Sequence, residues 1–230
     1  MSENITRIMR LLQFTDSTFP VGTFSFSNGL ETAGFEKIVY DRQTLHDFAK
    51  AQALQAAFTD GVAAIAAHRA WLADDYEAAT LADSTLILCK MNDEARQMLR
   101  RMGKKLAELG QHLFDSPMIS RWLADIRADV TPGTYPVAQG LTFAAAGISE
   151  RDLFCSHQYG VVNMVLSAAL RCVRVSHYDT QQILYEMSSG AEALYDEVKD
   201  MRIDEMHAFF PELDIIASLH EKGNMRMFMN

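Results

Sequence analysis

The sequence has little cysteine and a shortage of positive charge, and both restrict what the chain can be. Its three cysteines, Cys89, Cys155 and Cys172, are odd in number and lack CxxC spacing. Such a set predicts neither a disulfide scaffold nor a structural zinc site, and favours the reducing cytoplasm. Lysine and arginine number 21 against 30 aspartates and glutamates, a formal charge of −9. Nucleic acids and anionic membranes attract basic surfaces, so we expect neither as a partner.

Long apolar runs and strand patterns are also missing. No apolar run reaches the roughly 18 residues that can span a membrane. The N-terminal MSENITRIMRLLQF has none of the features of a secretory leader, so we expect none. Alternating β-branched residues are scarce, and the one Asn-Gly pair, at 28–29, leads into helical sequence instead of joining two strands.

Helical periodicity dominates what is there. After a capping residue at Asn92, apolar residues recur at alternating steps of four and three, and Gly110 is a plausible end of that helix. Asp41 can cap a long helical segment in which Gly61 marks a break. Asp179 and Gln182 can form the capping box of a later helix, whose stripe of apolar residues continues to residue 201. Further helices are expected over residues 4–14, 75–90, 117–128, 137–147 and 150–173, with a turn at 131–136 and a short last helix after residue 211.

These patterns predict an all-α fold, a single helical bundle of about eight to ten helices. We expect residues 1–230 to form one domain, with a C-terminal tail, residues 221–230, that depends on a partner.

Motifs for catalysis are weak. Gly29 and Gly34 have the glycine spacing of a phosphate-binding loop, but Phe35 and Glu36 follow where lysine and a hydroxyl residue are needed. No G-x-S-x-G elbow surrounds the loop serines, and cysteine and histidine at 155 and 157 are too close in sequence to face each other on a helix. A stand-alone helical hydrolase is therefore disfavoured, and we expect no catalytic residue.

The seven histidines are scattered and make no repeated Glu-x-x-His pattern. We expect no resident cofactor and no metal ligand set. A weak or transient nickel site stays open, because imidazole suits borderline metals.

Three surface features remain. The loop FPVGTFSFSNGLE, residues 19–31, carries aromatic residues among turn formers. A dense basic row follows at Arg100, Arg101, Lys104 and Lys105, either a solvated helix face or a docking face. The tail NMRMFMN, residues 224–230, is apolar for a chain end and must be covered, either by this chain's own body or by a partner. This combination is typical of a binding protein.

Five segments, in order, resemble motifs of the urease accessory protein UreF family. They are PVGTFSFSNGLE at 20–31, RRMGKKL at 100–106, TYPVAQGLTFAAAGIS at 134–149, AALRCVR at 168–174 and LDIIASLHEKGNMRMFMN at 213–230. The family's glycine-rich turn after the arginine helix is replaced here by VSHYDTQQ, residues 175–182, which marks a divergent member.

The resemblance implies an all-α, dimeric accessory factor and not an enzyme. Such a protein sits between a UreD/UreH-type protein and the GTPase UreG, and helps deliver nickel to apo-urease. The rival interpretations are a regulator that donates Arg100 or Arg101 to the GTPase and a helical scaffold for an unrelated complex.

Candidate partner-binding residues follow from the resemblance and from the three surface features. They are Pro20, Gly22, Phe24, Ser25, Phe26, Ser27, Gly29 and Glu31 in the loop, Arg100, Arg101, Lys104 and Lys105 in the row, and His220, Glu221, Arg226 and Phe228 near the C-terminus. Arg226 and Phe228 are the expected anchors for the UreD/UreH-type protein, and the loop and the basic row are candidates for the GTPase. Tyr159 is the candidate for self-association.

Overall fold

The computed structural model describes residues 5–16, 18–221 and 226–229 of the chain. Over these residues it forms helices α1 to α12, three short helical turns and no strand, which confirms the all-α prediction. The helices are α1 (Ile5–Thr15), α2 (Leu30–Phe35), α3 (Arg42–Ala56), α4 (Val62–Leu72), α5 (Tyr76–Leu88), α6 (Asp93–Leu113), α7 (Pro117–Arg127), α8 (Tyr135–Ala145), α9 (Glu150–Cys172), α10 (His177–Ser188), α11 (Ala191–Val198) and α12 (Pro211–His220). Their number exceeds the eight to ten expected, even if the continuous α3 and α4 are counted as one.

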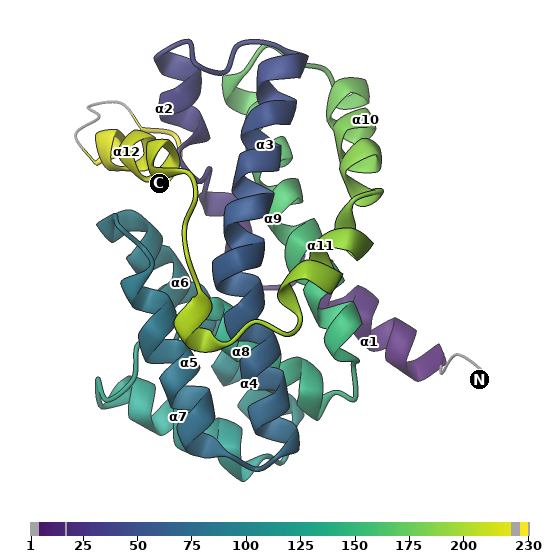
Figure 1. Ribbon diagram of the computed structural model, residues 1–230, viewed down its shortest axis with the longest axis vertical. Helices are drawn as coiled ribbons and strands as arrows, with labels where there is room; N and C mark the ends of the chain where they lie inside the picture. Colours follow the sequence, from purple (N-terminus) through teal and green to yellow (C-terminus); the bar gives the residue numbers. More distant parts are fainter. Residues whose placement is uncertain (1–4, 17, 222–225, 230) are drawn as a thin grey trace.

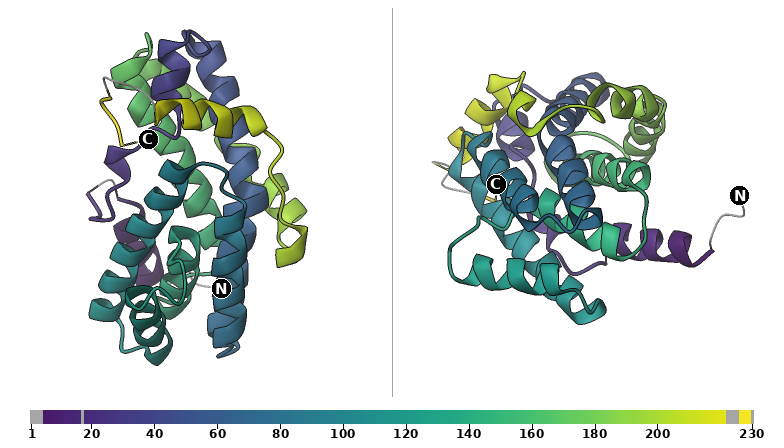
Figure 2. Two further views of the ribbon diagram at one scale, coloured as in Figure 1. Left: turned by 90° about the vertical axis from the view of Figure 1, so that its left-hand side faces the viewer. Right: turned by 60° about the horizontal axis from the view of Figure 1, so that its bottom comes forward.

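Two long helical columns organise the described part of the chain (Figure 1). Helices α3 and α4 run through it end to end, and α9 packs beside α3. Helices α2, α10 and α12 surround the upper half, whereas α5 to α8 surround α4 in the lower half. Helix α12 lies across the long helices and α1 points away from them, so a single bundle is not confirmed (Figures 1 and 2).

Buried side chains form one large cluster in each half. The lower cluster contains Trp122, Leu106 and Leu141, each almost completely buried between α6, α7 and α8. The upper cluster joins Leu30 of α2 and Val165 of α9 to residues of α3, α10 and α12. Burial of this apolar surface is the main favourable term in folding. No helix of the described residues is both long enough and apolar enough to cross a membrane.

Two predicted helix starts are confirmed by their hydrogen bonds. The Asp41 carboxylate accepts from the N–H of Thr44 at 2.9 Å, and the Asn92 side-chain oxygen accepts from the N–H of Ala95 at 2.7 Å. Each bond satisfies a donor that has no partner within the first turn.

Two predicted helix ends are wrong. Helix α6 continues past Gly110 to Leu113, since this glycine is used for packing: a Cβ there would lie 3.1 Å from Thr142 Oγ1 of α8. The helix expected from Asp179 to residue 201 is two helices, with the chain turning at Gly190 between α10 and α11.

Two local details also differ from the prediction. The capping box of α10 pairs Ser176 with Asp179, three residues before the predicted pair. At Gly61 the chain does not break: residues Ala57–Gly61 widen into a π turn, and a Cβ on Gly61 would lie 2.9 Å from the ring of Phe154. A wide turn of this kind is common where a helix must accommodate a neighbouring side chain or a functional residue.

A buried carboxylate shapes the turn before α8. Asp83 of α5 accepts from the Thr131 hydroxyl at 2.6 Å and from the N–H groups of Gly133 and Thr134 at 2.8 Å each. The predicted turn at 131–136 is therefore present up to residue 134, and α8 begins at Tyr135.

Candidate functional site

The early loop is built around residues with positive φ. Gly22, Asn28 and Gly29 have φ of 88°, 53° and 79°. Glycine adopts this conformation without strain and asparagine tolerates it. Gly29 is also closely packed, since a Cβ there would lie 3.3 Å from the backbone of Ala217 in α12. The loop thus brings the start of α2 directly against α12.

The two phenylalanines of the loop point to opposite sides. Phe26 is only 5% exposed and belongs, with Val21, to the lower buried cluster. Phe24, at the centre of the short 3-10 turn Thr23–Ser25, is 71% exposed. Both were predicted to be partner-binding anchors, and in this structure only Phe24 presents an accessible ring.

The C-terminal tail, residues 226–229, lies against this loop (Figure 2). The N–H of Met229 donates to the carbonyl oxygen of Ser25 at 2.8 Å. The ring of Phe228 is 5% exposed and packs in the upper buried cluster with Leu30 and Val165. Of the two alternatives for covering the tail, the structure shows the chain's own body over Phe228.

Arg171, in the last turn of α9, joins the loop to the tail. Its guanidinium carbon lies 4.2 Å from the ring centre of Phe24 and 4.0 Å from that of Phe228. Its Nη2 donates to the carbonyl oxygen of Phe24 at 3.2 Å. A planar cation can stack on two aromatic faces at once, so one side chain holds both segments.

A cluster of charged groups fixes the other end of the tail. Glu31 Oε1 accepts from the N–H of Met227 at 2.7 Å, and Glu31 Oε2 accepts from the N–H of Phe228 at 3.1 Å. His220 lies between two carboxylates, with Nε2 3.0 Å from Glu31 and Nδ1 2.7 Å from Glu94. Arg226 Nη1 lies 2.7 Å from the other oxygen of Glu94. We refer to this arrangement as the loop–tail site. It consists of residues 22–31, residues 226–229, Glu94, Arg171 and His220.

The electrostatics of this site favour an ionised Glu31. Burial by itself would raise the pKa of Glu31, but hydrogen bonds from Met227, His220 and Phe228 more than offset that effect and lower it. Glu31 was predicted to be a partner-binding residue of the loop; in this structure its carboxylate binds the backbone of the chain's own tail.

The basic row borders the loop–tail site. Arg100, Arg101, Lys104 and Lys105 are all exposed on α6, and Arg101 Nη1 lies 3.8 Å from the sulfur of Met229. Among the described residues no carboxylate pairs with Arg100, Arg101 or Lys104, whereas Lys105 lies 3.7 Å from Glu108. Loop, tail and basic row, three separate features of the sequence, are therefore neighbours in space.

The remaining predicted residues lie around these groups. Pro20 and Gly22 are exposed, Ser25 is half-buried, and Ser27 and Gly29 are buried under the loop. Glu221 is exposed and accepts from the N–H of Asp93 at 3.1 Å. Tyr159, 42% exposed on α9, lines a pocket of about 90 Å³ together with Phe24 and Arg171.

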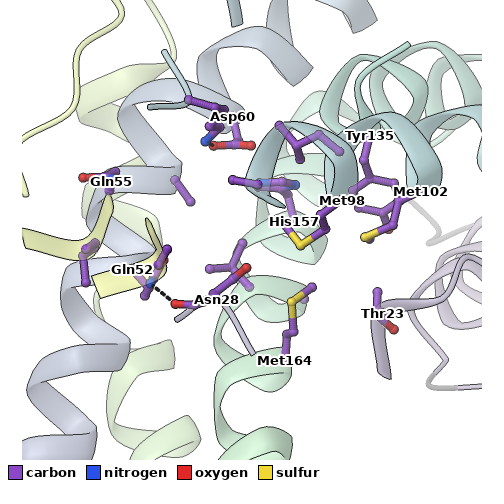
Figure 3. A pocket seen from close by; sticks show the side chains of 18 of the residues that line it. Thr23, Asn28, Gln52, Gln55, Asp60, Met98, Met102, Tyr135, His157 and Met164 are labelled. Atoms are coloured by element: carbon purple, nitrogen blue, oxygen red, sulfur yellow. Dashed lines mark hydrogen bonds and ion pairs between the residues drawn. The ribbon is translucent and has the colours of Figure 1, made fainter. Parts of the chain in front are cut away.

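A second cavity, of about 120 Å³, lies beneath the loop between α3, α6, α9 and α12 (Figure 3). Its wall includes the buried ion pair of Asp60 and Lys90 and the imidazole of His157, whose Nδ1 lies 2.7 Å from Gln139 Oε1. Burial lowers the pKa of His157. Burial would raise the pKa of Asp60, but the Lys90 ammonium opposes this and the pKa lies below its ordinary value.

These groups do not make a recognisable catalytic set. Asp60 is neutralised by Lys90, and among the residues lining the cavity there is no serine, threonine or cysteine paired with His157 as a nucleophile would be. Within the described part of the chain, no group of three or more histidine, cysteine and carboxylate side chains is arranged to hold a metal ion. What the geometry offers is a recognition surface, formed by an exposed aromatic ring, a row of exposed basic side chains and a docked peptide tail.

Outside the loop and the tail, two residues of the loop–tail site were missed by sequence reasoning. Glu94 sits in the first turn of α6, where an acidic residue is ordinary, and nothing in its neighbourhood points to a histidine 126 positions away. Arg171 lies within the AALRCVR segment that carried part of the resemblance, and that was the only signal available for it.

Comparison with known proteins identifies the family of the chain. A family model described as UreF matches residues 39–188. The protein "Urease accessory protein UreF 2" of Brucella canis is 47% identical over 223 residues, covering 97% of this chain and 92% of that protein. "Urease accessory protein UreF" of Yersinia enterocolitica is 44% identical over 227 residues, covering 99% of this chain and all of that protein. The chain therefore belongs to the UreF family.

Proposed function

We propose that this chain is a urease maturation factor of the cytoplasm that helps assemble the nickel metallocentre of urease. It acts as an adaptor, bridging a UreD/UreH-type protein and the GTPase UreG on apo-urease, and not as an enzyme. Nickel is the cargo of the assembly and reaches this chain at most transiently. Membership of a family whose relatives are named urease accessory proteins supports the role in maturation.

The observation that carries the adaptor role is the convergence of loop, tail and basic row. Phe24 offers an exposed ring held in place by Arg171, which limits the entropy lost when a partner covers it. Arg100, Arg101 and Lys104 add positive charge next to the tail, where Arg101 contacts Met229, on a chain that is acidic overall. A rigid aromatic residue stacked on an arginine is typical of an interface hot spot.

Substitution of the exposed ring tests this proposal. We expect Phe24→Ala to reduce co-purification with the UreD/UreH-type protein or with UreG at least tenfold, since a hot-spot residue contributes about 2 kcal/mol or more. Tyr178→Ala is the matched control, because Tyr178 is 89% exposed on α10. Unchanged recovery of both partners with Phe24→Ala, in a protein of normal helicity, would refute the role of this surface.

A second candidate function is regulation of the GTPase by a donated arginine. The exposed Arg100 and Arg101 support it, as neither is paired with a carboxylate among the described residues. An arginine supplied to a GTPase stabilises charge on the transferred phosphoryl group. Accelerated GTP turnover on mixing with UreG, lost in Arg101→Ala but kept in Lys104→Ala, would favour this function; no acceleration would favour the adaptor.

Self-association is the remaining part of the proposal. Tyr159 projects from α9 beside Phe24 and is 42% exposed, which leaves its ring available to a second copy. We expect Tyr159→Asp to shift the chain from dimer to monomer in sedimentation equilibrium, with Tyr185→Asp on α10 as the exposed control. A Tyr159→Asp variant that still sediments as a dimer would remove this residue from the interface.

A further inference from the structure

The imidazole of His220 is placed where only its charged form makes both of its contacts. The ring is 3% exposed, with Nε2 3.0 Å from Glu31 Oε2 and Nδ1 2.7 Å from Glu94 Oε2. An ionised carboxylate can only accept hydrogen bonds, so each ring nitrogen must carry a proton to donate. A neutral imidazole has one N–H and can serve one of the two carboxylates only.

We propose that His220 is a proton-controlled latch for the C-terminal tail. The charged ring holds Glu31 and Glu94 in the positions from which they bind the tail, and loss of its proton releases residues 226–229 from the loop.

The charge balance of the cluster supports the latch. Glu31 and Glu94 supply two negative charges, and His220 and Arg226 supply two positive ones. Deprotonation of His220 leaves one negative charge in excess, in a site where the side chains of Glu31 and Glu94 are 17% and 11% exposed. An uncompensated charge in a largely buried site is unfavourable, and separation of the two carboxylates would break the contacts that Glu31 makes with Met227 and Phe228 and that Glu94 makes with Arg226.

The other charged or titratable groups packed around His220 do not replace its proton. Arg171 stacks on Phe228 and faces the rings, and Glu221 is bonded to the backbone of Asp93. Burial raises the pKa of the nearby Cys172 thiol to about 11, so it stays neutral over the range of interest. The cationic partners of the two carboxylates are thus His220 and Arg226 among the described residues.

The direction of the pH effect follows from these contacts. The contribution of His220 to tail docking requires both ring N–H groups, so it is lost when the ring gives up a proton. Glu31 acts in the opposite sense, because its pKa is lower in the folded chain than in the unfolded chain. Its contribution to tail docking is present above its pKa in the unfolded chain and is lost as the pH falls through its pKa in the folded chain. We therefore expect the tail to be docked while His220 is protonated and Glu31 is ionised, and to be released at higher pH once the ring of His220 has lost a proton.

Release would free the backbone of the tail and expose the apolar surface of the upper buried cluster against which Phe228 packs. The use of this exposed surface by a partner rests on the proposed function, whereas the latch itself is a property of the single chain.

Methyl-carbon NMR of methionine in the full-length chain tests the latch directly. Met229 and Met227 flank Phe228, and Met229→Leu and Met227→Leu assign their signals. Between pH 6 and pH 9 we expect the Met229 methyl signal to move to the position of a free methionine, with the same midpoint as the His220 ring signals. A Met229 signal that stays at its docked position while His220 titrates would overturn the proposal.

A single isosteric substitution separates the latch from general alkaline loosening. In Glu94→Gln the amide nitrogen can donate to a neutral His220 while the amide oxygen still accepts from Arg226. We expect the tail of this variant to remain docked at pH 9, where the wild-type tail is free. Glu212→Gln, an exposed change on α12, is the matched control and should release its tail as the wild type does. Release of the Glu94→Gln tail at the wild-type midpoint would contradict the latch.

Failure of the proposed function and failure of the latch give different results. The NMR titration uses this chain alone, so it stands even if Phe24→Ala leaves both partners bound. Should the Glu94→Gln chain prove unfolded by circular dichroism, the wild-type titration still decides the question, since the latch requires Met229 and His220 to share one midpoint.

Discussion

Arg171 stacks on Phe228, with 4.0 Å between the guanidinium carbon and the ring centre. The two residues come from the end of α9 and from the tail, 57 positions apart in the chain. The same guanidinium carbon lies 4.2 Å from the ring centre of Phe24, so the exposed ring of the loop and the buried ring of the tail are ordered by one cation. The candidate surface is therefore a single assembly of three segments.

The first prediction concerns this cation. We expect Arg171→Gln to lower the free energy of unfolding by about 1–2 kcal/mol, because two cation–π contacts and one hydrogen bond to Phe24 are lost. Urea unfolding followed by circular dichroism measures the change. Arg174→Gln, an exposed arginine three residues further on, should stay within about 0.5 kcal/mol of wild type. Equal stability of the two variants would show that the stacking contributes nothing.

The second prediction concerns the buried ion pair of Lys90 and Asp60. Lys90→Met leaves the Asp60 carboxylate in the cavity wall without its cation, and removal of one partner of a buried pair costs about 3–5 kcal/mol. The loss is measured by urea unfolding at neutral pH.

The same variant changes the response to acid. With Lys90 present, the pKa of Asp60 is lower in the folded chain than in the unfolded chain, where it is near 4. The contribution of Asp60 to the free energy of unfolding is therefore present above about pH 4 and is lost as the pH falls through its pKa in the folded chain. In Lys90→Met the burial that raises the pKa of Asp60 is no longer opposed by the ammonium, and the carboxylate takes up its proton at higher pH. We therefore expect the difference in free energy of unfolding between wild type and Lys90→Met to become smaller as the pH is lowered. A difference that stays constant from pH 4 to pH 7 would contradict this account.

The third prediction uses two glycines that lie inside helices. A Cβ at Gly103 of α6 would lie 2.0 Å from the carbonyl oxygen of Gly133, whereas a Cβ at Gly160 of α9 meets no atom within 4 Å. We expect Gly103→Ala to lower the thermal midpoint strongly, since the clash costs about 3 kcal/mol or more. Gly160→Ala should raise it slightly, because alanine favours a helix by about 0.5–1 kcal/mol. A tolerated Gly103→Ala would mean that α6 and α8 approach less closely than described.

Much of the fold could be predicted from local patterns. Asp41 and Asn92 are correctly identified as capping residues because their side chains bond within three positions of the chain. Gly110 and Gly190 show the limit of such reasoning. Gly110 lies inside α6, where its missing side chain lets α8 pack closely. Gly190 lies between α10 and α11, although the stripe of apolar residues in the sequence continues past it.

The candidate site was less predictable. The loop, the basic row and the tail were each recognisable, but their meeting depends on contacts that span the chain, such as Glu31 with Met227 and Arg101 with Met229. The histidine at 220 was singled out through the family resemblance alone, and its two carboxylate partners were not foreseeable from spacing. Three-dimensional packing, and not local propensity, determines which exposed-looking residues are covered.

The segment Phe24-Ser25-Phe26 gives the last prediction, because the sequence alone does not separate its two rings. Phe26 is 5% exposed among core residues, so Phe26→Ala should lower the free energy of unfolding by about 3–5 kcal/mol. Phe24 is 71% exposed and loses only its contact with Arg171, so Phe24→Ala should cost about 1 kcal/mol or less. Unfolding in urea compares the two variants directly. If the order were reversed, the ring of Phe24 would be the structural one, and loss of partner binding in Phe24→Ala would report unfolding instead of a missing contact.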